Sequence, residues 1–330
     1  MRNFSYIRVG TPEEGARLLA GRNDGRVQVL AGGTDLIPLL KEDIYSPDTL
    51  VDISGWAEGV GIERAGDSLV LGARTPLSAI ADDVTIRGEY TALTDACRLA
   101  ATPQLRNMGT IGGNLLQQTR CWYYRGPFDC WLKGGEKCFA RDGENEYHSI
   151  FTTGDSPCVS AHPSDPAAAL LALDASVRFT TSSEGEREMP LEDLYALPEP
   201  SRRSFVTLPN NAVITAVLLP NPSGNRRSTY VKAMARAAWG FALTGVAIVL
   251  EGEGTVTKAR VALSGVAPIP IRAREVEEAL VGKAITEISG DTLADLLVAE
   301  AQPLSHNGYK VALLRGVFVE ALETVCKSSF

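Results

Sequence analysis

The stretch "AGGTDLIPLL" (residues 31–40) determines how the first part of the chain folds. The strand-like run "RVQVL" (residues 26–30) precedes it. Within it, the turn "AGGTD" leads into a short helix or turn that begins at "LIPLL", so the glycines lie where a strand ends and a helix can begin. Because glycine lacks a Cβ atom, the pair Gly32 and Gly33 lets the backbone approach a ligand closely. Consecutive amides in such a turn form a concave anion site, most often for phosphate. A tight turn without a ligand is the alternative.

A second glycine pair lies in "RNMGTIGGNLLQ" (residues 106–117), after a predicted helix. Neither pair matches G-x-G-x-x-G or G-x-x-x-x-G-K-[ST], so a Rossmann dinucleotide site and a P-loop are not supported. Two such motifs, separated by the 80 residues from Gly32 to Gly112, suit a diphosphate gripped from both sides, as in FAD.

The order of elements predicts an α+β protein of two parts. A chain of 330 residues exceeds the usual size of one hydrophobic core. The run "SYIRV" (residues 5–9), a capping box at residues 11–14 and the strand at 26–30 predict a short βαβ unit. The polar break "NPSGNRRS" (residues 221–228) predicts a domain boundary. Beyond it, three strand-like runs (residues 228–236, 241–250 and 256–263) precede two amphipathic helices.

Composition excludes several classes of function. The formal net charge of −8 would repel nucleic acid, and the 45% hydrophobic content is that of a globular protein. The amino terminus has no apolar signal region, and no run reaches eighteen uninterrupted apolar residues. We therefore predict a cytoplasmic protein without a membrane span or a nucleic-acid partner.

Four of the six cysteines lie in one aromatic, Gly-rich segment, residues 117–160. The intervals between them are eight, seven and nineteen residues, which include none of the short Cys-x2–4-Cys pairs typical of structural zinc sites. Their number suits a [4Fe–4S] cluster, and neighbouring aromatic residues could shelter it from water. A zinc site, and free or disulfide-forming thiols, remain alternatives on these grounds. The remaining two, Cys97 and Cys326, are predicted to be small buried apolar residues.

Three ordered motifs, "AGGTDLIPLL", "RNMGTIGGNLLQ" and "HPSDPAAALLALDA" (residues 162–175), make the chain resemble the flavin-binding subunits of the molybdenum hydroxylases. This family includes the medium subunit of carbon monoxide dehydrogenase, the flavin subunits of bacterial xanthine dehydrogenases and aldehyde oxidoreductases, and the beta subunit of 4-hydroxybenzoyl-CoA reductase. The resemblance covers nearly the whole chain. It implies a PCMH-type FAD-binding domain of two α/β subdomains (residues 1–220, divided into about 1–55 and 56–220). A small C-terminal domain of a β-sheet plus helices (residues 225–330) follows.

The resemblance also implies which residues bind FAD. The residues that would hold the pyrophosphate and nearby groups are Ala31, Gly32, Gly33, Thr34, Asp35, Leu36, Thr110, Gly112, Gly113 and Asn114. Asp165 lies where the family places a carboxylate on the adenosine ribose, and Lys232 where some members have a lysine near the flavin ring. An ordinary solvated strand residue is the alternative for Lys232. The family pattern Ser-x-x-Tyr-Arg is altered here, with Lys310 in place of the arginine.

An inserted segment with four cysteines looks like the iron–sulfur loop of some members of the family. The resemblance therefore implies a [4Fe–4S] cluster bound by Cys121, Cys130, Cys138 and Cys158. For His148 and His162, local hydrogen bonds are predicted in preference to metal ligation, and His306 is predicted to lie on the surface.

The sequence shows no Ser/His/Asp or Cys/His arrangement, so bound cofactors must supply the chemistry. The resemblance implies an FAD-dependent oxidoreductase subunit that transfers electrons within a heterotrimer. Its partners would be a large molybdenum-cofactor subunit and a small [2Fe–2S] subunit, and FAD would pass electrons to an external acceptor. A partner could carry the complex out of the cytoplasm. A zinc-stabilised scaffold or thiol sensor, and a standalone flavin oxidase, are the alternatives.

Overall fold

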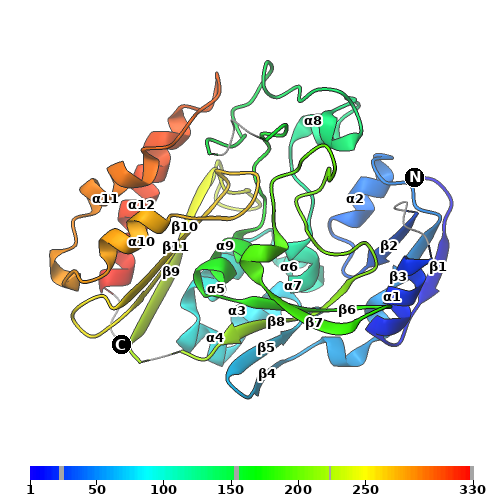
Figure 1. The fold of residues 1–330 in the computed structure, drawn as a ribbon, viewed down its shortest axis with the longest axis horizontal. Helices are drawn as coiled ribbons and strands as arrows, with labels where there is room; N and C mark the ends of the chain where they lie inside the picture. Colours follow the sequence, from blue (N-terminus) through cyan, green and yellow to red (C-terminus); the bar gives the residue numbers. More distant parts are fainter. Residues whose placement is uncertain (22–25, 152–155, 223, 328–330) are drawn as a thin grey trace.

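The computed structural model describes residues 1–21, 26–151, 156–222 and 224–327. Three β-sheets lie one after another across the molecule, with helices packed between and around them (Figure 1). This mixture of helices and sheets confirms the predicted α+β class. Residues 152–155 of the predicted cysteine segment and 328–330 of the predicted C-terminal domain lie outside the described residues.

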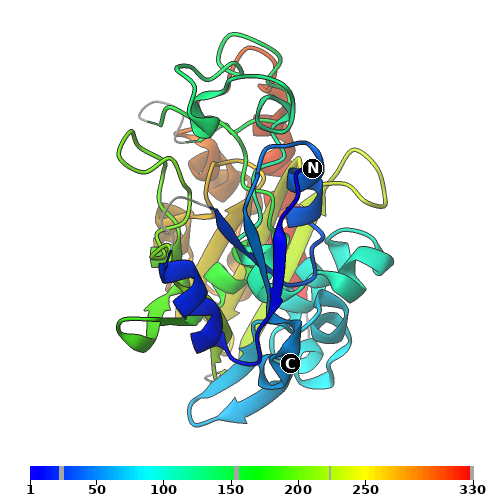
Figure 2. The same cartoon turned by 90° about the vertical axis from the view of Figure 1, so that its right-hand side faces the viewer.

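The first sheet has the strand order β1-β3-β2, formed by Ser5–Arg8, Thr49–Asp52 and Val27–Leu30, and all its pairings are parallel (Figure 2). Helix α1 (Pro12–Ala20) connects β1 to β2, as the capping box predicts: the Thr11 side chain accepts a hydrogen bond from the Glu14 amide. The first glycine motif follows β2 directly and leads into helix α2 (Leu36–Lys41). The end of β2 therefore presents this motif at the edge of the sheet.

The central sheet is antiparallel, in the order β4-β5-β8-β6-β7. Its strands are Ile62–Ala65, Ser68–Gly72, Val213–Pro220, Ser176–Thr181 and Gly185–Pro190. The sequence did not reveal β7, because nearly all of its side chains are exposed and no apolar alternation marks it. The helices associated with this part are α3 (Leu77–Asp82), α4 (Val84–Glu89), α5 (Thr91–Leu99), α6 (Pro103–Met108), α7 (Ile111–Leu115) and α9 (Asp165–Ala172).

Helix α9 is buried along its whole length. All eight of its residues are buried, and the helix contacts α5 on one side and strands β10 and β11 on another. A helix that is apolar all round belongs in a protein core, and its alanines let these neighbours approach closely. Its first residue, Asp165, is consequently a carboxylate held inside the protein.

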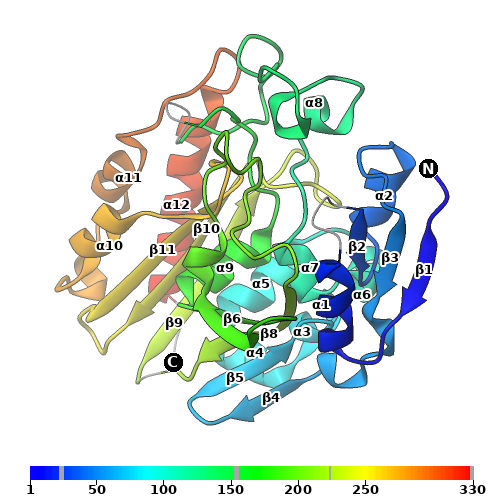
Figure 3. The same ribbon diagram turned by 45° about the vertical axis from the view of Figure 1, so that its right-hand side comes forward.

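The third sheet is antiparallel in the order β12-β11-β10-β9. Its strands are Ile271–Arg272, Lys258–Ser264, Thr244–Glu251 and Arg226–Ala233. Helices α10 (Arg274–Leu280), α11 (Gly290–Val298) and α12 (Tyr309–Lys327) lie on the outer face of this sheet (Figures 1 and 3). The strands precede the helices, as predicted, but strand β12 and helix α10 were not predicted.

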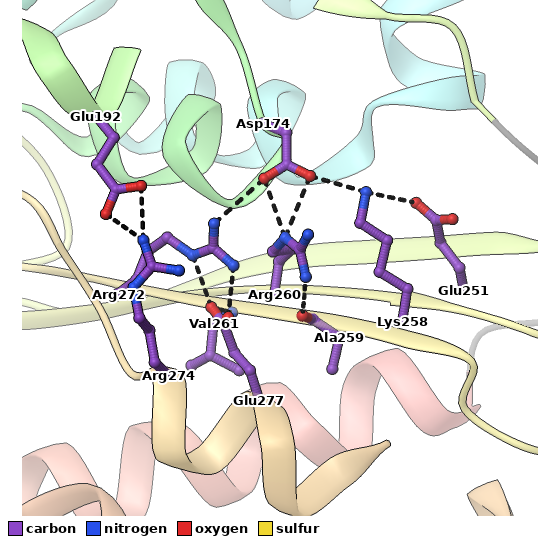
Figure 4. Close-up of polar contacts among 10 residues, drawn as sticks. All are labelled: Asp174, Glu192, Glu251, Lys258, Ala259, Arg260, Val261, Arg272, Arg274 and Glu277. Atoms are coloured by element: carbon purple, nitrogen blue, oxygen red, sulfur yellow. Dashed lines mark hydrogen bonds and ion pairs between the residues drawn. The ribbon is translucent and has the colours of Figure 1, made fainter. Parts of the chain in front are cut away.

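A network of ion pairs connects the turn after α9 to the third sheet (Figure 4). The carboxylate of Asp174 lies 3.0 Å from Nε of Arg260, 3.3 Å from Nη1 of Arg272 and 2.8 Å from Nζ of Lys258. Arg272 also pairs with Glu277 of α10 at 2.5 Å. The network ties the central part of the molecule to the third sheet and its helices.

Most of the cysteine-rich segment lies outside the sheets and contains the short helix α8 (Trp122–Arg125), while its residues Ile150 and Phe151 pack in the core of the third sheet. It occupies one end of the molecule, near α2 and the chain leading into α12 (Figures 1 and 3). Hydrogen bonds from the Asn145 side chain to Ser305 and from the His306 amide to Asn145 join these segments. Among the described residues, none of the helices has the length and apolar character needed to cross a membrane.

Candidate cofactor sites

A cavity of about 820 Å³ lies between the first sheet, the central helices and the loop that connects β9 to β10. Every predicted residue of both glycine motifs lines it: Ala31, Gly32, Gly33, Thr34, Asp35, Leu36, Thr110, Gly112, Gly113 and Asn114. Asp165 also lines this cavity, whereas Lys232 is absent from its described lining. The structure thus brings together two motifs that are far apart in the sequence.

The two glycine motifs are in direct backbone contact. A Cβ atom added to Gly32 would overlap the carbonyl oxygen of Met108, and one added to Gly109 would lie 3.4 Å from the Thr34 hydroxyl. Gly33 has a φ of +70°, in the left-handed region that favours glycine. Only glycine at position 32 allows this approach, and the two motifs form one continuous wall of the cavity.

The second glycine pair lies within a helix, where the sequence indicated a turn. Thr110 caps α7, and its Oγ1 accepts a hydrogen bond from the Gly113 amide at 3.2 Å. Oδ1 of the Asn114 side chain accepts a hydrogen bond from the Ser164 hydroxyl at 2.5 Å, and Ser164 in turn caps α9. These contacts fix the second motif against the core helix.

Asp165 and Lys232 form a buried ion pair. Their side chains are 3% and 1% exposed, and Nζ of Lys232 lies 2.7 Å from Oδ2 of Asp165. The Tyr230 hydroxyl donates to Oδ1 of the same carboxylate at 2.6 Å. Burial raises the pKa of Asp165, while Lys232 and Tyr230 oppose this change. The alternative of a solvated Lys232 is therefore wrong.

Arginine side chains that the sequence analysis missed surround Asp35 at the cavity wall. The guanidinium groups of Arg120 and Arg125 lie 2.6 Å and 2.8 Å from Oδ1 of Asp35, and the Gln118 amide donates to Oδ2 at 2.8 Å. Burial lowers the pKa of Arg120 to about 10, opposed by the charge of Asp35, so this arginine stays protonated at neutral pH. Two cations around one carboxylate make this wall of the cavity electropositive.

The loop between β9 and β10 contributes further residues that were not predicted. Arg236, Trp239 and Phe241 line the cavity, and the Arg120 guanidinium lies 4.8 Å from the centre of the Phe241 ring. The aromatic pair around Gly240 was the available signal, but a residue pattern in a loop does not show which surface the loop faces.

All four cysteines of the segment line a second, small cavity: Cys121, Cys130, Cys138 and Cys158. Its other walls are mainly aromatic, including Tyr123, Tyr124, Trp131 and Phe139. Burial raises the pKa of Cys121 to about 12 and of Cys158 to about 11, with smaller contributions from neighbouring cysteines. These thiols would keep their protons at neutral pH unless a bound cation made the thiolates favourable.

The four thiols are not arranged around a single metal ion. Among the described residues, no group of three or more His, Cys, Asp or Glu side chains is arranged to hold one metal ion. Tetrahedral zinc with bonds of about 2.3 Å would draw four sulfur atoms to within roughly 4 Å of one another. A four-iron cluster holds its thiolates farther apart, around a larger inorganic core.

Two histidines and the two cysteines outside the segment lie in environments with few polar contacts. Nδ1 of the buried His162 accepts a hydrogen bond from the Ser164 amide at 3.4 Å, which confirms the predicted local bond. His306 is half exposed, and its Nδ1 lies 3.6 Å from Glu144. Cys97 is fully buried, as predicted, and Cys326 is partly buried.

Comparison with known protein families identifies the class of the chain. Residues 2–222 match the family described as the FAD binding domain in molybdopterin dehydrogenase. Residues 229–325 match the CO dehydrogenase flavoprotein C-terminal domain. The chain belongs to the family of FAD-binding subunits of the molybdenum hydroxylases, and the predicted fold and family are confirmed.

Individual relatives have similar lengths. The chain is 34% identical over 326 residues to the aldehyde oxidoreductase FAD-binding subunit PaoB of Escherichia coli (strain K12), covering 98% of both chains. It is 26% identical to the carbon monoxide dehydrogenase medium chain of Hydrogenophaga pseudoflava, covering 91% of this chain and 88% of the relative. A solved structure of carbon monoxide dehydrogenase from the same organism matches with a TM-score of 0.77 and 25% identity, covering 98% and 97% of the two chains.

These relatives are dehydrogenase and oxidoreductase FAD subunits, so the chain is an FAD-dependent oxidoreductase subunit. The alternative of a zinc-stabilised scaffold or thiol sensor finds no support among them. The family and the cavity agree on the principal cofactor, because the family motif residues line a cavity large enough for a dinucleotide.

Proposed function

We propose that this chain transfers electrons inside a molybdenum-containing hydroxylase or dehydrogenase complex, using FAD in the larger cavity and a [4Fe–4S] cluster in the cysteine cavity. One observation carries the proposal: residues 117–121 form the wall between the two cavities. Gln118 and Arg120 line the larger cavity, while Thr119 and Cys121 line the smaller one. Alternate residues of one short segment thus face the two proposed cofactors.

FAD, when bound, would accept electrons from iron–sulfur centres and release them to an external acceptor. The chain's own residues would hold it. The continuous wall of the two glycine motifs would approach the pyrophosphate, with Thr34 and Asn114 as side-chain partners. Arg120 adds positive charge at the same cavity. Lys232 is proposed to have an indirect role: it does not line the described cavity, but its ion pair fixes the position of the Asp165 carboxylate, which does.

The residues of the cysteine cavity suit a [4Fe–4S] cluster. Four thiolates would supply the cluster's ligands, and the aromatic walls would keep water away from it. The proposed cluster would be held by this chain, in addition to any that a partner carries. We propose that it exchanges electrons with FAD across the wall formed by residues 117–121.

The names of relatives support the proposed partners. A related carbon monoxide dehydrogenase subunit is called a medium chain, and another relative is a subunit of the 6-hydroxypseudooxynicotine dehydrogenase complex. We propose that this chain pairs with a large molybdenum-cofactor subunit and a small [2Fe–2S] subunit, in the cytoplasm. We also propose two functional domains, residues 1–220 for FAD and 225–330 for the C-terminal flavoprotein domain.

Anaerobic purification tests the cofactor content. The chain should contain one FAD and about four irons with acid-labile sulfide. Substituting serine for Cys130 should remove most of the iron and leave the flavin, whereas the same substitution at Cys326 should change neither. Zinc in place of iron, or iron unaffected by the Cys130→Ser change, would contradict the proposed cluster, and lack of flavin would contradict the larger site.

A further inference from the structure

We infer that His148 donates a hydrogen bond from Nε2 to the sulfur of Cys121 when the cluster is bound, and that this bond raises the reduction potential of the cluster. The inference rests on the proposed cluster and adds a residue that is not one of its ligands. It makes His148 a positioning and tuning residue rather than a metal ligand.

The first evidence is the contact itself. Nε2 of His148 lies 3.2 Å from Sγ of Cys121, although the two residues are 27 positions apart in the sequence. His148 is 2% exposed, so water does not compete for this contact. A metal-bound thiolate has no proton and can only accept, so the hydrogen between these atoms must belong to the imidazole.

The environment of the other ring nitrogen supports the same tautomer. Nδ1 of His148 is buried and has no hydrogen-bond partner in the described structure. A proton on Nδ1 would be an unpaired buried donor, and Nε2 would then face the thiolate with its lone pair. A proton on Nε2 avoids both costs, and we assign this tautomer to the cluster-bound protein.

Neighbouring side chains hold the ring in place. The Trp122 and Tyr123 rings lie 5.6 Å and 6.2 Å from the imidazole, centre to centre. Both residues directly follow Cys121 in the sequence, so the contacts that orient the imidazole come from the segment that carries the sulfur. Replacement by another flat ring would preserve this packing while removing the donor.

Residues of the C-terminal part fix the backbone of His148. Nζ of Lys310, which is fully buried at the start of α12, donates to the His148 carbonyl oxygen at 2.9 Å and to that of Gly265 at 2.5 Å. The Asn307 side chain donates to the same His148 oxygen at 3.2 Å. The altered family position, lysine in place of arginine, therefore helps to place the donor.

A hydrogen bond to a ligand sulfur favours the reduced cluster. Each electron taken up adds negative charge to the cluster and its thiolates, and an N–H group directed at one of them stabilises that charge. Loss of the donor should therefore lower the potential without removing a ligand. Packing alone would give no such change.

The test compares His148→Phe, His148→Gln and the surface control His306→Gln in the anaerobically purified full chain. Iron content and the potential from an EPR-monitored redox titration are the two measurements. His148→Phe should keep about four irons. At a fixed potential, its ratio of reduced to oxidised cluster should fall about tenfold, a shift of about 59 mV for one electron. His148→Gln, which retains an N–H donor, should move the potential less, and His306→Gln should match the wild type.

Two results would overturn the inference. An unchanged potential in His148→Phe with full iron would show that the contact does not tune the cluster. Loss of iron in both His148 variants, with circular dichroism unchanged, would show that the imidazole is a ligand. If the wild type itself contained no iron, the proposed cluster would fail first, so the two failures are distinguishable.

Discussion

Oδ1 of Asp35 lies 2.6 Å from Nη1 of Arg120, which connects the first glycine motif to the residue immediately before the first cysteine of the segment. The same carboxylate binds Arg125 and the Gln118 amide. The Asp35 side chain thus contacts both the wall of the larger cavity and the cysteine segment. The electrostatics of one proposed site are therefore coupled to the position of the other.

Removing this charge should disturb both sites. The Asp35→Asn substitution would leave two largely buried guanidinium groups short of a counter-charge, and we expect a loss of about 2 kcal/mol in the free energy of unfolding. Iron and flavin per chain should both fall. Denaturant unfolding and cofactor analysis would check this. Asp43→Asn, at an exposed ion pair with the N-terminus, is the control and should cost less than about 1 kcal/mol.

The contact between the glycine motifs predicts a severe effect from one methyl group. A Cβ atom at Gly32 would overlap the Met108 carbonyl oxygen, so Gly32→Ala must force the two motifs apart. We expect the purified variant to lack flavin. Gly88→Ala is the matched control, because no atom lies within 4 Å of its added Cβ and alanine favours the helix there. Flavin retained by Gly32→Ala would show that the contact is dispensable.

Removing one partner of the buried ion pair between Asp165 and Lys232 should strongly lower the free energy of unfolding. The Lys232→Met substitution leaves the carboxylate of Asp165 without its cation, and breaking such a pair costs about 3–5 kcal/mol. Lys327→Met, which removes an exposed partner of Glu323, should change the free energy of unfolding by less than about 1 kcal/mol. Equal effects of the two substitutions, measured by urea unfolding, would contradict the burial of the Lys232 charge.

The buried His162 predicts a loss of stability in acid. Burial lowers the pKa of His162 to about 3, so the folded protein keeps this ring neutral while the unfolded chain binds a proton below its ordinary pKa of about 6.5. The free energy of unfolding should therefore fall as pH drops from about 6.5 toward 3, by about 1.4 kcal/mol per pH unit for this proton. His162→Asn should make that slope shallower. An identical slope in the variant would refute the assignment.

The sequence predicted residues near the glycine motifs better than the contacts between distant segments. Both motifs line one cavity because each stands at the end or start of a regular element, a position that local patterns indicate. The partner of Lys232 could not be predicted in this way. That residue faces Asp165 only because side chains of β9 reach the first residue of the buried helix α9.

In the cysteine segment, too, the sequence predicted local features but not the contacts between distant residues. Composition indicated a group of thiols, and the structure places all four at one cavity. The approach of His148 to Cys121 depends on how residues 122–147 turn, and most of that path is irregular structure. Periodicity gives no information there. The positions of Arg120 and Phe241 likewise depend on contacts between loops.

Anomalous diffraction at the iron absorption edge, from crystals of the anaerobically purified chain, tests the central claim most directly. The account predicts an iron signal enclosed by Cys121, Cys130, Cys138 and Cys158, and flavin density along the wall formed by the two glycine motifs. Flavin density elsewhere, or a cysteine cavity that contains zinc or only packed side chains, would contradict it.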